Sequence, residues 1–264
     1  MKDPSTNSAL PISPLLRIEK VTKAFGGICA LQDLSFDIPG GAVYAVIGPN
    51  GAGKTTLFNL ITGACAPDSG RIIFEGKEIQ GRAVYDVVAL GIARTFQNVE
   101  LFESMTALEN VLVGRHVRTR SGFWSAILGG PSFRREEREA RRRALEIMEF
   151  AGIADLASKR SGDLAFGWQR FLEIARALAA GPRLLLLDEP AAGLNAVETQ
   201  RLGELIRKIR DLDITIVLVE HDMNLTMDVS DRLLVLNEGK RLAEGAPREI
   251  QMDEAVMDAY LGRG

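Results

Sequence analysis

The sequence predicts an α/β fold with a mostly parallel β-sheet, an antiparallel β part near the N-terminus and an inserted helical region. Three apolar segments of strand length, Val43–Ile47, Leu184–Leu187 and Ile214–Val219, are separated by segments with helical patterns. Strands of a parallel sheet are covered on both faces, so they read as continuous apolar runs. Functional residues of such sheets collect at the carboxyl ends of the strands. We therefore expect the site at the residues that follow these runs.

Composition favours a globular protein of the reducing cytosol. The chain has 264 residues, 46% of them hydrophobic and 25% charged, which suits one large domain or one domain with an insertion. A net charge of −3 argues against general attraction to nucleic acid, and we expect no nucleic-acid partner. Cys29 and Cys65 do not indicate a disulfide framework or a zinc site. Apolar runs stay well short of the roughly 18 residues that span a bilayer, so we expect the chain not to cross a membrane by itself.

The N-terminal part predicts a tail followed by strands. Residues 1–14 are polar and contain Pro and Ser, which predicts a loose tail without the apolar core of a signal peptide. We expect one domain from residue 15 to residue 264. Leu16–Val21 and Ala30–Ile38 alternate apolar and polar residues, as half-buried strands do, with Phe25 in the loop between them.

The middle of the chain predicts the helical insertion. Tyr85–Leu90 reads as a helix and Ile92–Phe96 as a short strand. From about residue 101 to residue 161 the pattern is helical, with helices expected over Thr106–Val113 and Phe133–Phe150. Arg115–Trp124 is basic and aromatic. A solvated helix face with one buried aromatic pair is favoured there over contact with a membrane partner or anionic headgroups.

The last third predicts alternating helices and strands. The expected helices cover Leu172–Ala180, Ala196–Arg210 and Asp222–Val229, and two short helices finish the chain. Two further strands are expected over Arg232–Asn237 and Lys240–Ala243, around a turn at Glu238-Gly239.

A phosphate-binding loop follows the first apolar strand and precedes a helix, which predicts a P-loop NTPase core. Its glycines let successive backbone N–H groups surround a phosphate, and the helix that begins at Gly53 adds its positive end. Lys54 can reach the β- and γ-phosphates, and the Thr55 hydroxyl can bind Mg²⁺. The residues expected to bind the nucleotide are Asn50, Gly51, Ala52, Gly53, Lys54, Thr55 and Thr56.

Three further strand ends carry candidate catalytic residues. Leu184–Leu187 is followed by Asp188, a candidate Mg²⁺ ligand, and by Glu189, which could orient and deprotonate a water molecule. His221 follows another apolar strand, and Gln97 follows Ile92–Phe96. The alternative for Asp188 and Glu189 is a strand that merely ends in exposed acids. The alternative for His221 is a structural role. A small-molecule kinase or a GTPase would share the loop, but the guanine-reading Asn-Lys-x-Asp motif is absent.

From about Leu16 to Gly262 the chain resembles ABC transporter ATPase subunits. The matching elements share the order and spacing of that family: Gly48–Thr55, Gln97, Gly167–Arg170, Leu184–Pro190, Gly193–Asn195 and His221. The resemblance implies ATP hydrolysis with Mg²⁺. It also implies that Phe25 stacks on adenine, that Gln97 senses Mg²⁺ and the membrane partner, and that Glu189 is the catalytic carboxylate. His221 would be the switch histidine, and Gly167 would contact the nucleotide of a second subunit.

The closer resemblance is to the group that serves branched-chain amino acid uptake, on Phe96–Phe102, Glu109-Asn110 and Ala191–Asn195. One segment departs from the family's Leu-Ser-Gly-Gly-Gln signature, because Leu164–Trp168 reads Leu-Ala-Phe-Gly-Trp. Ala and an aromatic residue are usual in this group at the second and third positions, whereas Trp168 is not. Asn195 stands where Asp is common.

The resemblance implies a peripheral subunit on the cytoplasmic face of the inner membrane. Its partners would be membrane permease subunits, a second ATPase subunit in a heterodimer or a homodimer, and indirectly a periplasmic substrate-binding protein. The implied function is to energise uptake of branched-chain amino acids or a related small substrate. Export of lipid or lipopolysaccharide, and a non-transport role, are the alternatives within the family.

Overall fold

The computed structural model describes residues 14–115 and 131–261. Residues 1–13 of the predicted tail and most of the Arg115–Trp124 stretch therefore lie outside the described residues. The strands are β1 Leu16–Phe25, β2 Ile28–Ile38, β3 Val43–Ile47, β4 Ser69–Phe74, β5 Lys77–Glu78, β6 Ile92–Arg94, β7 Leu184–Asp188, β8 Thr215–Val219, β9 Arg232–Asn237 and β10 Lys240–Gly245. The helices are α1 Lys54–Ile61, α2 Val84–Leu90, α3 Ala107–Arg115, α5 Pro131–Phe150, α6 Phe166–Ala179, α7 Ala196–Arg210, α8 Met223–Val229, α9 Pro247–Gln251 and α10 Glu254–Leu261, with short 3₁₀ turns at Ala154–Leu156 and Ser161–Asp163.

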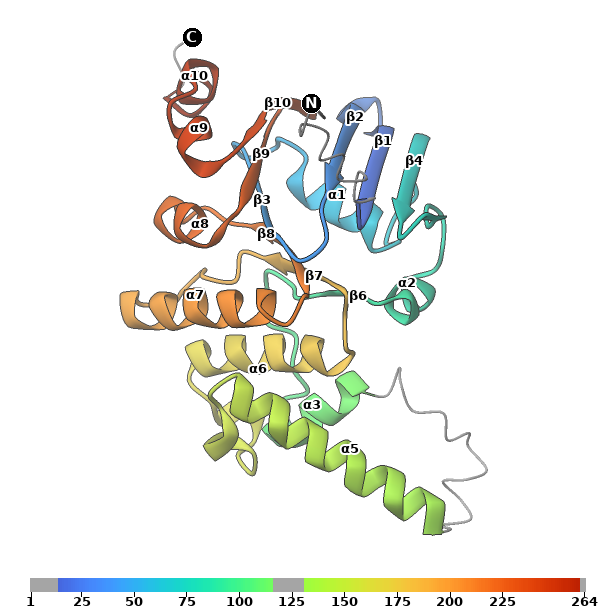
Figure 1. The fold of residues 1–264 in the computed structure, drawn as a ribbon, viewed down its shortest axis with the longest axis vertical. Coiled ribbons are helices and arrows are strands. Elements are labelled where there is room, and N and C mark those ends of the chain that lie inside the picture. The colour runs from blue at the N-terminus through green and yellow to red at the C-terminus, as the bar shows by residue number, and fades with distance from the viewer. Residues whose placement is uncertain (1–13, 116–130, 262–264) are drawn as a thin grey trace, which may run out of the picture.

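Two sheets form the upper part of the molecule (Figure 1). The larger sheet has the order β10-β9-β3-β8-β7-β6, and its strands pair in parallel except at β10-β9. The smaller sheet is antiparallel, with the order β2-β1-β4-β5. These findings confirm the predicted fold class, a mostly parallel sheet with an antiparallel part from the N-terminal strands.

The larger sheet separates two apolar cores, because successive side chains of a strand point to opposite faces. From β3, Val43, Ala45 and Ile47 face the core that contains α3, α5, α6 and α7, whereas Tyr44 and Val46 face the core that contains α1 and the antiparallel sheet. Every residue of β3, β7 and β8 is buried. Coverage of both faces is the reason that these strands read as unbroken apolar runs in the sequence.

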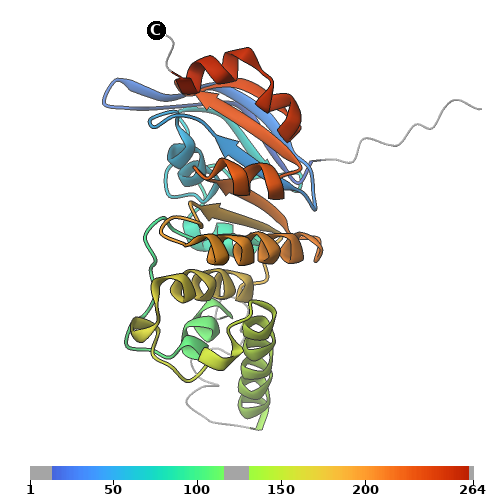
Figure 2. The same cartoon turned by 90° about the vertical axis from the view of Figure 1, so that its left-hand side faces the viewer.

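Helices fill the described chain between β6 and β7 and form the lower part of the molecule (Figures 1 and 2). α3 packs on α5 and α6, and both views place α6 directly alongside α7, which in turn covers the sheet. The prediction that residues 101–161 are a separate subdomain stays a prediction, because α6 belongs to the same apolar core as these helices. Within 14–115 and 131–261, no helix is long and apolar enough to cross a membrane.

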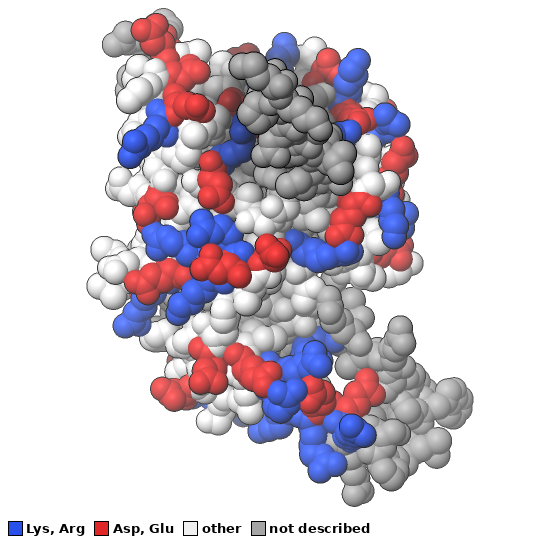
Figure 3. Space-filling view, viewed as in Figure 1, with Lys and Arg blue, Asp and Glu red and all other residues white. Residues whose placement is uncertain are grey.

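Charges of both signs are interspersed on the face shown in Figure 3. Along α7 and its neighbours, Arg207 pairs with Asp228, and Arg210 pairs with Asp211 and Asp231. Such exposed pairs each contribute little to stability. They show that Arg207 and Arg210 are matched by carboxylates.

Two element boundaries differ from the sequence predictions by more than two residues. β1 continues to Phe25, which was expected in a loop, because it forms a tight hairpin in which Phe25 pairs with Ile28. Register shifts after Ile18 and Val21 break the alternation that would have revealed this extension. α6 begins at Phe166 and not at Leu172. Its first turn contains Gly167, and glycine weakens a helical pattern in the sequence.

Candidate active site

The loop after β3 needs glycine at three positions. Gly48, Gly51 and Gly53 have φ values of 153°, 82° and 102°, which side chains rarely adopt. A Cβ on Gly48 would also lie 2.2 Å from the Leu236 carbonyl oxygen, and one on Gly53 would lie 2.6 Å from the Ala30 carbonyl oxygen. A Cβ on Gly51 would meet nothing within 4 Å. Packing against β2 and β9 therefore fixes the ends of the loop, and its middle faces open space.

Lys54 lies inside this loop at the start of α1. Its ammonium group donates hydrogen bonds to the Gly48 oxygen at 2.7 Å and the Pro49 oxygen at 3.1 Å. Burial lowers the pKa of Lys54, and the carboxylates of Glu189 and Asp188 oppose this shift. The two carboxylates at the end of β7 thus favour the charged form of the lysine in the loop.

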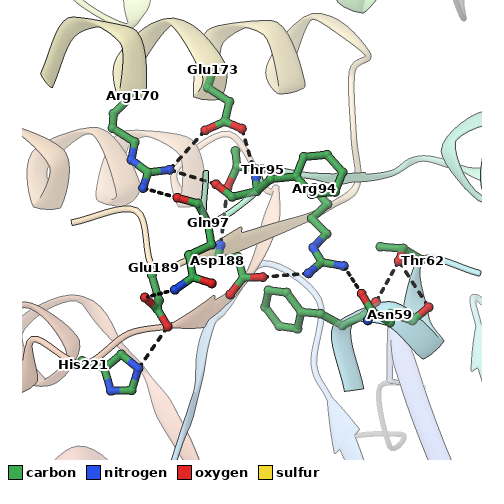
Figure 4. A network of polar contacts seen from close by, with 12 residues as sticks. Asn59, Thr62, Arg94, Thr95, Gln97, Arg170, Glu173, Asp188, Glu189 and His221 are labelled. Atoms are coloured by element: carbon green, nitrogen blue, oxygen red, sulfur yellow. Dashed lines mark hydrogen bonds and ion pairs between the residues drawn. The ribbon is translucent and has the colours of Figure 1, made fainter. Parts of the chain in front are cut away.

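The Glu189 carboxylate joins three separate parts of the chain (Figure 4). The Gln97 amide nitrogen donates to one oxygen at 2.9 Å, and Nε2 of His221 lies 3.0 Å from the other oxygen. Glu189 has φ +48°, and its backbone N–H donates to the Val219 oxygen at the end of β8. Parallel pairing of β6, β7 and β8 brings these residues together at one edge of the sheet, as the sequence predicts.

Asp188 is buried and paired with an arginine. Nη2 of Arg94 lies 2.7 Å from an Asp188 carboxylate oxygen, and Nη1 of Arg94 donates to the Asn59 side chain at 2.7 Å. The guanidinium also lies 5.3 Å from the ring centres of both Phe58 and Phe96. Arg94 therefore ties the acidic end of β7 to helix α1. The sequence prediction did not include Arg94, although a charged residue at the end of the otherwise apolar strand β6 was a signal for a role at the site.

Helix α6 holds the backbone that carries Gln97. Arg170 donates to the carbonyl oxygens of Phe96, at 2.8 Å, and of Gln97. The Glu173 carboxylate accepts from the Phe96 N–H at 3.0 Å and pairs with Arg170. Burial raises the pKa of Glu173, opposed by the Phe96 N–H and by Arg170. A buried ion pair on α6 thus positions the residue that contacts Glu189.

Glu220 organises the loops on the other side of the site. It is buried, and its carboxylate accepts from the N–H groups of Ala191, His221 and Asp222 at 2.6, 2.9 and 3.2 Å. The segment after Glu189 and the backbone of His221 are therefore held by one side chain. The sequence offered a signal for this role, because Glu220 follows β8 directly and immediately precedes His221.

Phe25 and Gly167 lie outside the hydrogen bonds that the described chain makes at Glu189. Phe25 ends β1 with half of its surface exposed, and the Lys23 ammonium lies 5.2 Å from its ring centre. Gly167 is the second residue of α6. Phe25 is half-exposed whereas Gly167 is buried, and the predicted roles of both toward a nucleotide stay predictions.

The residues expected to hold Mg²⁺ fit that ion in donor chemistry. The Thr55 hydroxyl is exposed in the first turn of α1, and Asp188 and the Gln97 amide supply further oxygen atoms. Mg²⁺ prefers oxygen ligands and usually takes one or two carboxylates together with phosphate oxygens. Bound there, it would neutralise charge on the β- and γ-phosphates.

These features define a P-loop nucleotide-binding core. A glycine loop with a buried lysine follows β3, and the carboxylates of Asp188 and Glu189 lie at the end of β7, on the other side of β8 in the same parallel sheet. Residues 31–192 match the family model described as ABC transporter, and residues 240–264 match the one described as branched-chain amino acid ATP-binding cassette transporter. The chain belongs to the ABC transporter ATP-binding family.

Known relatives support this assignment along nearly the whole chain. The chain is 45% identical to the high-affinity branched-chain amino acid transport ATP-binding protein BraF of Pseudomonas aeruginosa, over 94% of this chain and 98% of the relative. It is 43% identical to LivG of Escherichia coli K12, a protein of the same description, with the same coverage.

Solved structures show the same fold. An ATP-binding cassette of an ABC transporter in its ADP conformation is 32% identical with a TM-score of 0.82, covering 94% of this chain and 99% of its own. A dimeric cassette in a post-hydrolysis state, bound to ADP and Pi, is 27% identical with a TM-score of 0.75, covering 88% of this chain and 99% of its own.

The buried Arg94–Asp188 pair predicts that removal of the arginine alone lowers the free energy of unfolding more than removal of both charges. Arg94→Met leaves the Asp188 carboxylate buried without its partner, so we expect the free energy of unfolding to fall by about 3 kcal/mol or more. Urea-induced unfolding of the purified chain measures this change. Arg94→Met/Asp188→Asn removes the uncompensated charge and recovers part of the loss. Equal stability of the single and the double variant would show that the pair is not the cause.

Proposed function

We propose that this chain hydrolyses ATP, with Mg²⁺, and thereby energises uptake of branched-chain amino acids through separate membrane permease subunits. The observation that carries the proposal is the Glu189 carboxylate, which Gln97 and His221 hold at 2.9 and 3.0 Å beside the phosphate-binding loop. The substrate class rests on the relatives, since BraF and LivG are described as branched-chain amino acid transport proteins.

The geometry suits attack of water on a γ-phosphate. The water oxygen forms a bond to the γ-phosphorus, the bond from that phosphorus to the bridging oxygen breaks, and ADP leaves with that oxygen. Glu189 takes the proton of the attacking water and fixes its direction. Lys54 holds the β- and γ-phosphates, and backbone N–H groups of residues 50–56 surround them. His221, half-exposed next to Glu189, can contact the γ-phosphate or the water.

A second subunit completes the site in this proposal. Gly167, at the start of α6, would face the nucleotide of a partner cassette, and the partner's equivalent turn would face the loop at residues 48–56. The dimeric cassette among the structural relatives supports this arrangement. The partner is a different cassette or a second copy of this chain, and the altered signature Leu164–Trp168 would favour a pair of unequal sites.

The assembled complex would lie at the cytoplasmic face of the inner membrane. Permease subunits would contact the surface near Gln97, where the exposed apolar residues Phe96 and Phe102 lie close to the helical region. Movement of the Gln97 backbone by such a partner would be transmitted directly to Glu189. A periplasmic substrate-binding protein would deliver the amino acid to the permease.

Replacement of the proposed base separates binding from hydrolysis. In Glu189→Gln we expect ATP hydrolysis to slow by roughly 10²- to 10⁴-fold, the usual contribution of a positioned base. Steady-state phosphate release measures the rate, and binding of a fluorescent ATP analogue measures affinity, which should stay within a few-fold of wild type. Unchanged turnover would remove Glu189 from the role of base.

The transport role has its own test. Reconstitution of the chain with permease subunits from the same operon in proteoliposomes should raise its ATPase rate several-fold. Radiolabelled leucine should enter the vesicles only with ATP and a binding protein present. Stimulation by lipid or lipopolysaccharide, with no leucine uptake, would instead support the export alternative while leaving ATP hydrolysis intact.

A further inference from the structure

The first turn of α6 packs residue by residue against the start of α7. Phe166 lies over Gly193, where a Cβ would be 2.8 Å from the ring atom Cε1. Gly167 lies against Glu198, and the indole of Trp168 lies 5.7 Å from the Arg201 guanidinium. Figures 1 and 2 both show the two helices side by side. The unusual Trp168 of the signature is explained by this contact and by Phe171, whose ring centre is 5.9 Å away.

Glu198 makes the closest of these approaches. A Cβ on Gly167 would lie 2.3 Å from one carboxylate oxygen of Glu198 and 2.6 Å from its carboxyl carbon. The other carboxylate oxygen accepts from the Asn195 N–H at 3.0 Å and closes a capping box at the start of α7. The carboxylate therefore cannot swing away from position 167 without losing that hydrogen bond.

Gly167 does not need glycine for its backbone conformation. Its φ lies outside the left-handed region, in contrast to that of Gly193 at +79°. Ala165, the N-cap of α6, offers no side-chain hydrogen bond to the first turn. A carboxylate at this end of a helix is favourable, because the first turn carries partial positive charge. The Glu198 carboxylate thus lies at the N-terminal turns of both α6 and α7.

We propose that Glu198 is a positioning residue that sets the first turn of α6, and that position 167 is glycine because this carboxylate approaches it. The proposal rests on the proposed function, in which that turn faces the nucleotide of a partner subunit. Through Asn195, the same side chain connects the turn to the loop that follows Glu189. A change in that loop therefore moves the first turn of α6, the turn that would face the nucleotide of the partner subunit.

A double-mutant cycle in the full-length chain tests this dependence. Gly167→Ala should lower kcat for ATP hydrolysis by at least about tenfold when Glu198 is present. In the Glu198→Ala background, the same substitution should cost less than about twofold, because the group it collides with is gone. An equal cost in both backgrounds would overturn the proposal and assign the glycine to phosphate approach alone.

Two variants separate positioning from general stability. Glu198→Gln keeps the size of the side chain and an oxygen for the Asn195 N–H, so it should recover most of the kcat lost in Glu198→Ala. Glu249→Ala is the matched control, since Glu249 closes the N-terminus of α9 by accepting from the Ala246 N–H at 2.7 Å. It should leave kcat unchanged. A loss of kcat in Glu249→Ala equal to that in Glu198→Ala would reduce the effect to helix capping.

A second readout does not depend on hydrolysis. The chain contains two tryptophans, so Trp124→Phe leaves Trp168, next to Gly167, as the sole indole. Its emission should shift in Glu198→Ala and in Gly167→Ala, but Gly167→Ala should add no shift once Glu198 is removed. If the wild-type chain fails to hydrolyse ATP even when it is assembled with its partner subunits, the proposed function is wrong, and the Trp168 emission still tests the packing of Gly167 on Glu198. Additive shifts would contradict the role of Glu198.

Discussion

The site depends on the two contacts that hold the Glu189 carboxylate. Gln97 approaches from the segment after β6, and His221 approaches from the segment after β8, on either side of β7. The parallel order of these strands is what places the three residues at one sheet edge, so the buried sheet is a functional requirement as well as a stabilising one. A carboxylate bonded on both oxygens has a fixed direction, which is what a general base toward a positioned water requires.

Helix α6 connects this carboxylate to the surface that would meet a partner. Its Arg170–Glu173 pair holds the backbone of Phe96 and Gln97, and its first turn packs on Gly193 and Glu198. Separating a charged pair buried this deeply is costly, because it leaves an unpaired charge in the interior. A displacement of α6 therefore has to move Gln97 as well. The helix thus links Glu189 to the turn that, in our proposal, faces the nucleotide of a second subunit.

The sequence revealed the parts of this arrangement that follow from local pattern. Apolar runs predicted β3, β7 and β8, and the bounds predicted for α7 match those observed. Strand ends predicted that Glu189, Gln97 and His221 would meet. The partners of Asp188 and of the Phe96 N–H were missed, since Arg94 and Glu173 lie 94 and 77 residues away along the chain. Periodicity carries no information on such pairs, and the glycine in the first turn of α6 concealed the start of that helix.

The central claim is that Gln97 and His221 act through Glu189 as a single unit, and single-turnover ATP hydrolysis measures this most directly. The rates of Gln97→Ala, His221→Ala and the double variant are compared in the wild-type and the Glu189→Gln backgrounds. Groups that act as a unit are strongly non-additive. We predict that neither alanine substitution slows Glu189→Gln further by more than about twofold. Full, additive losses in that background would contradict it.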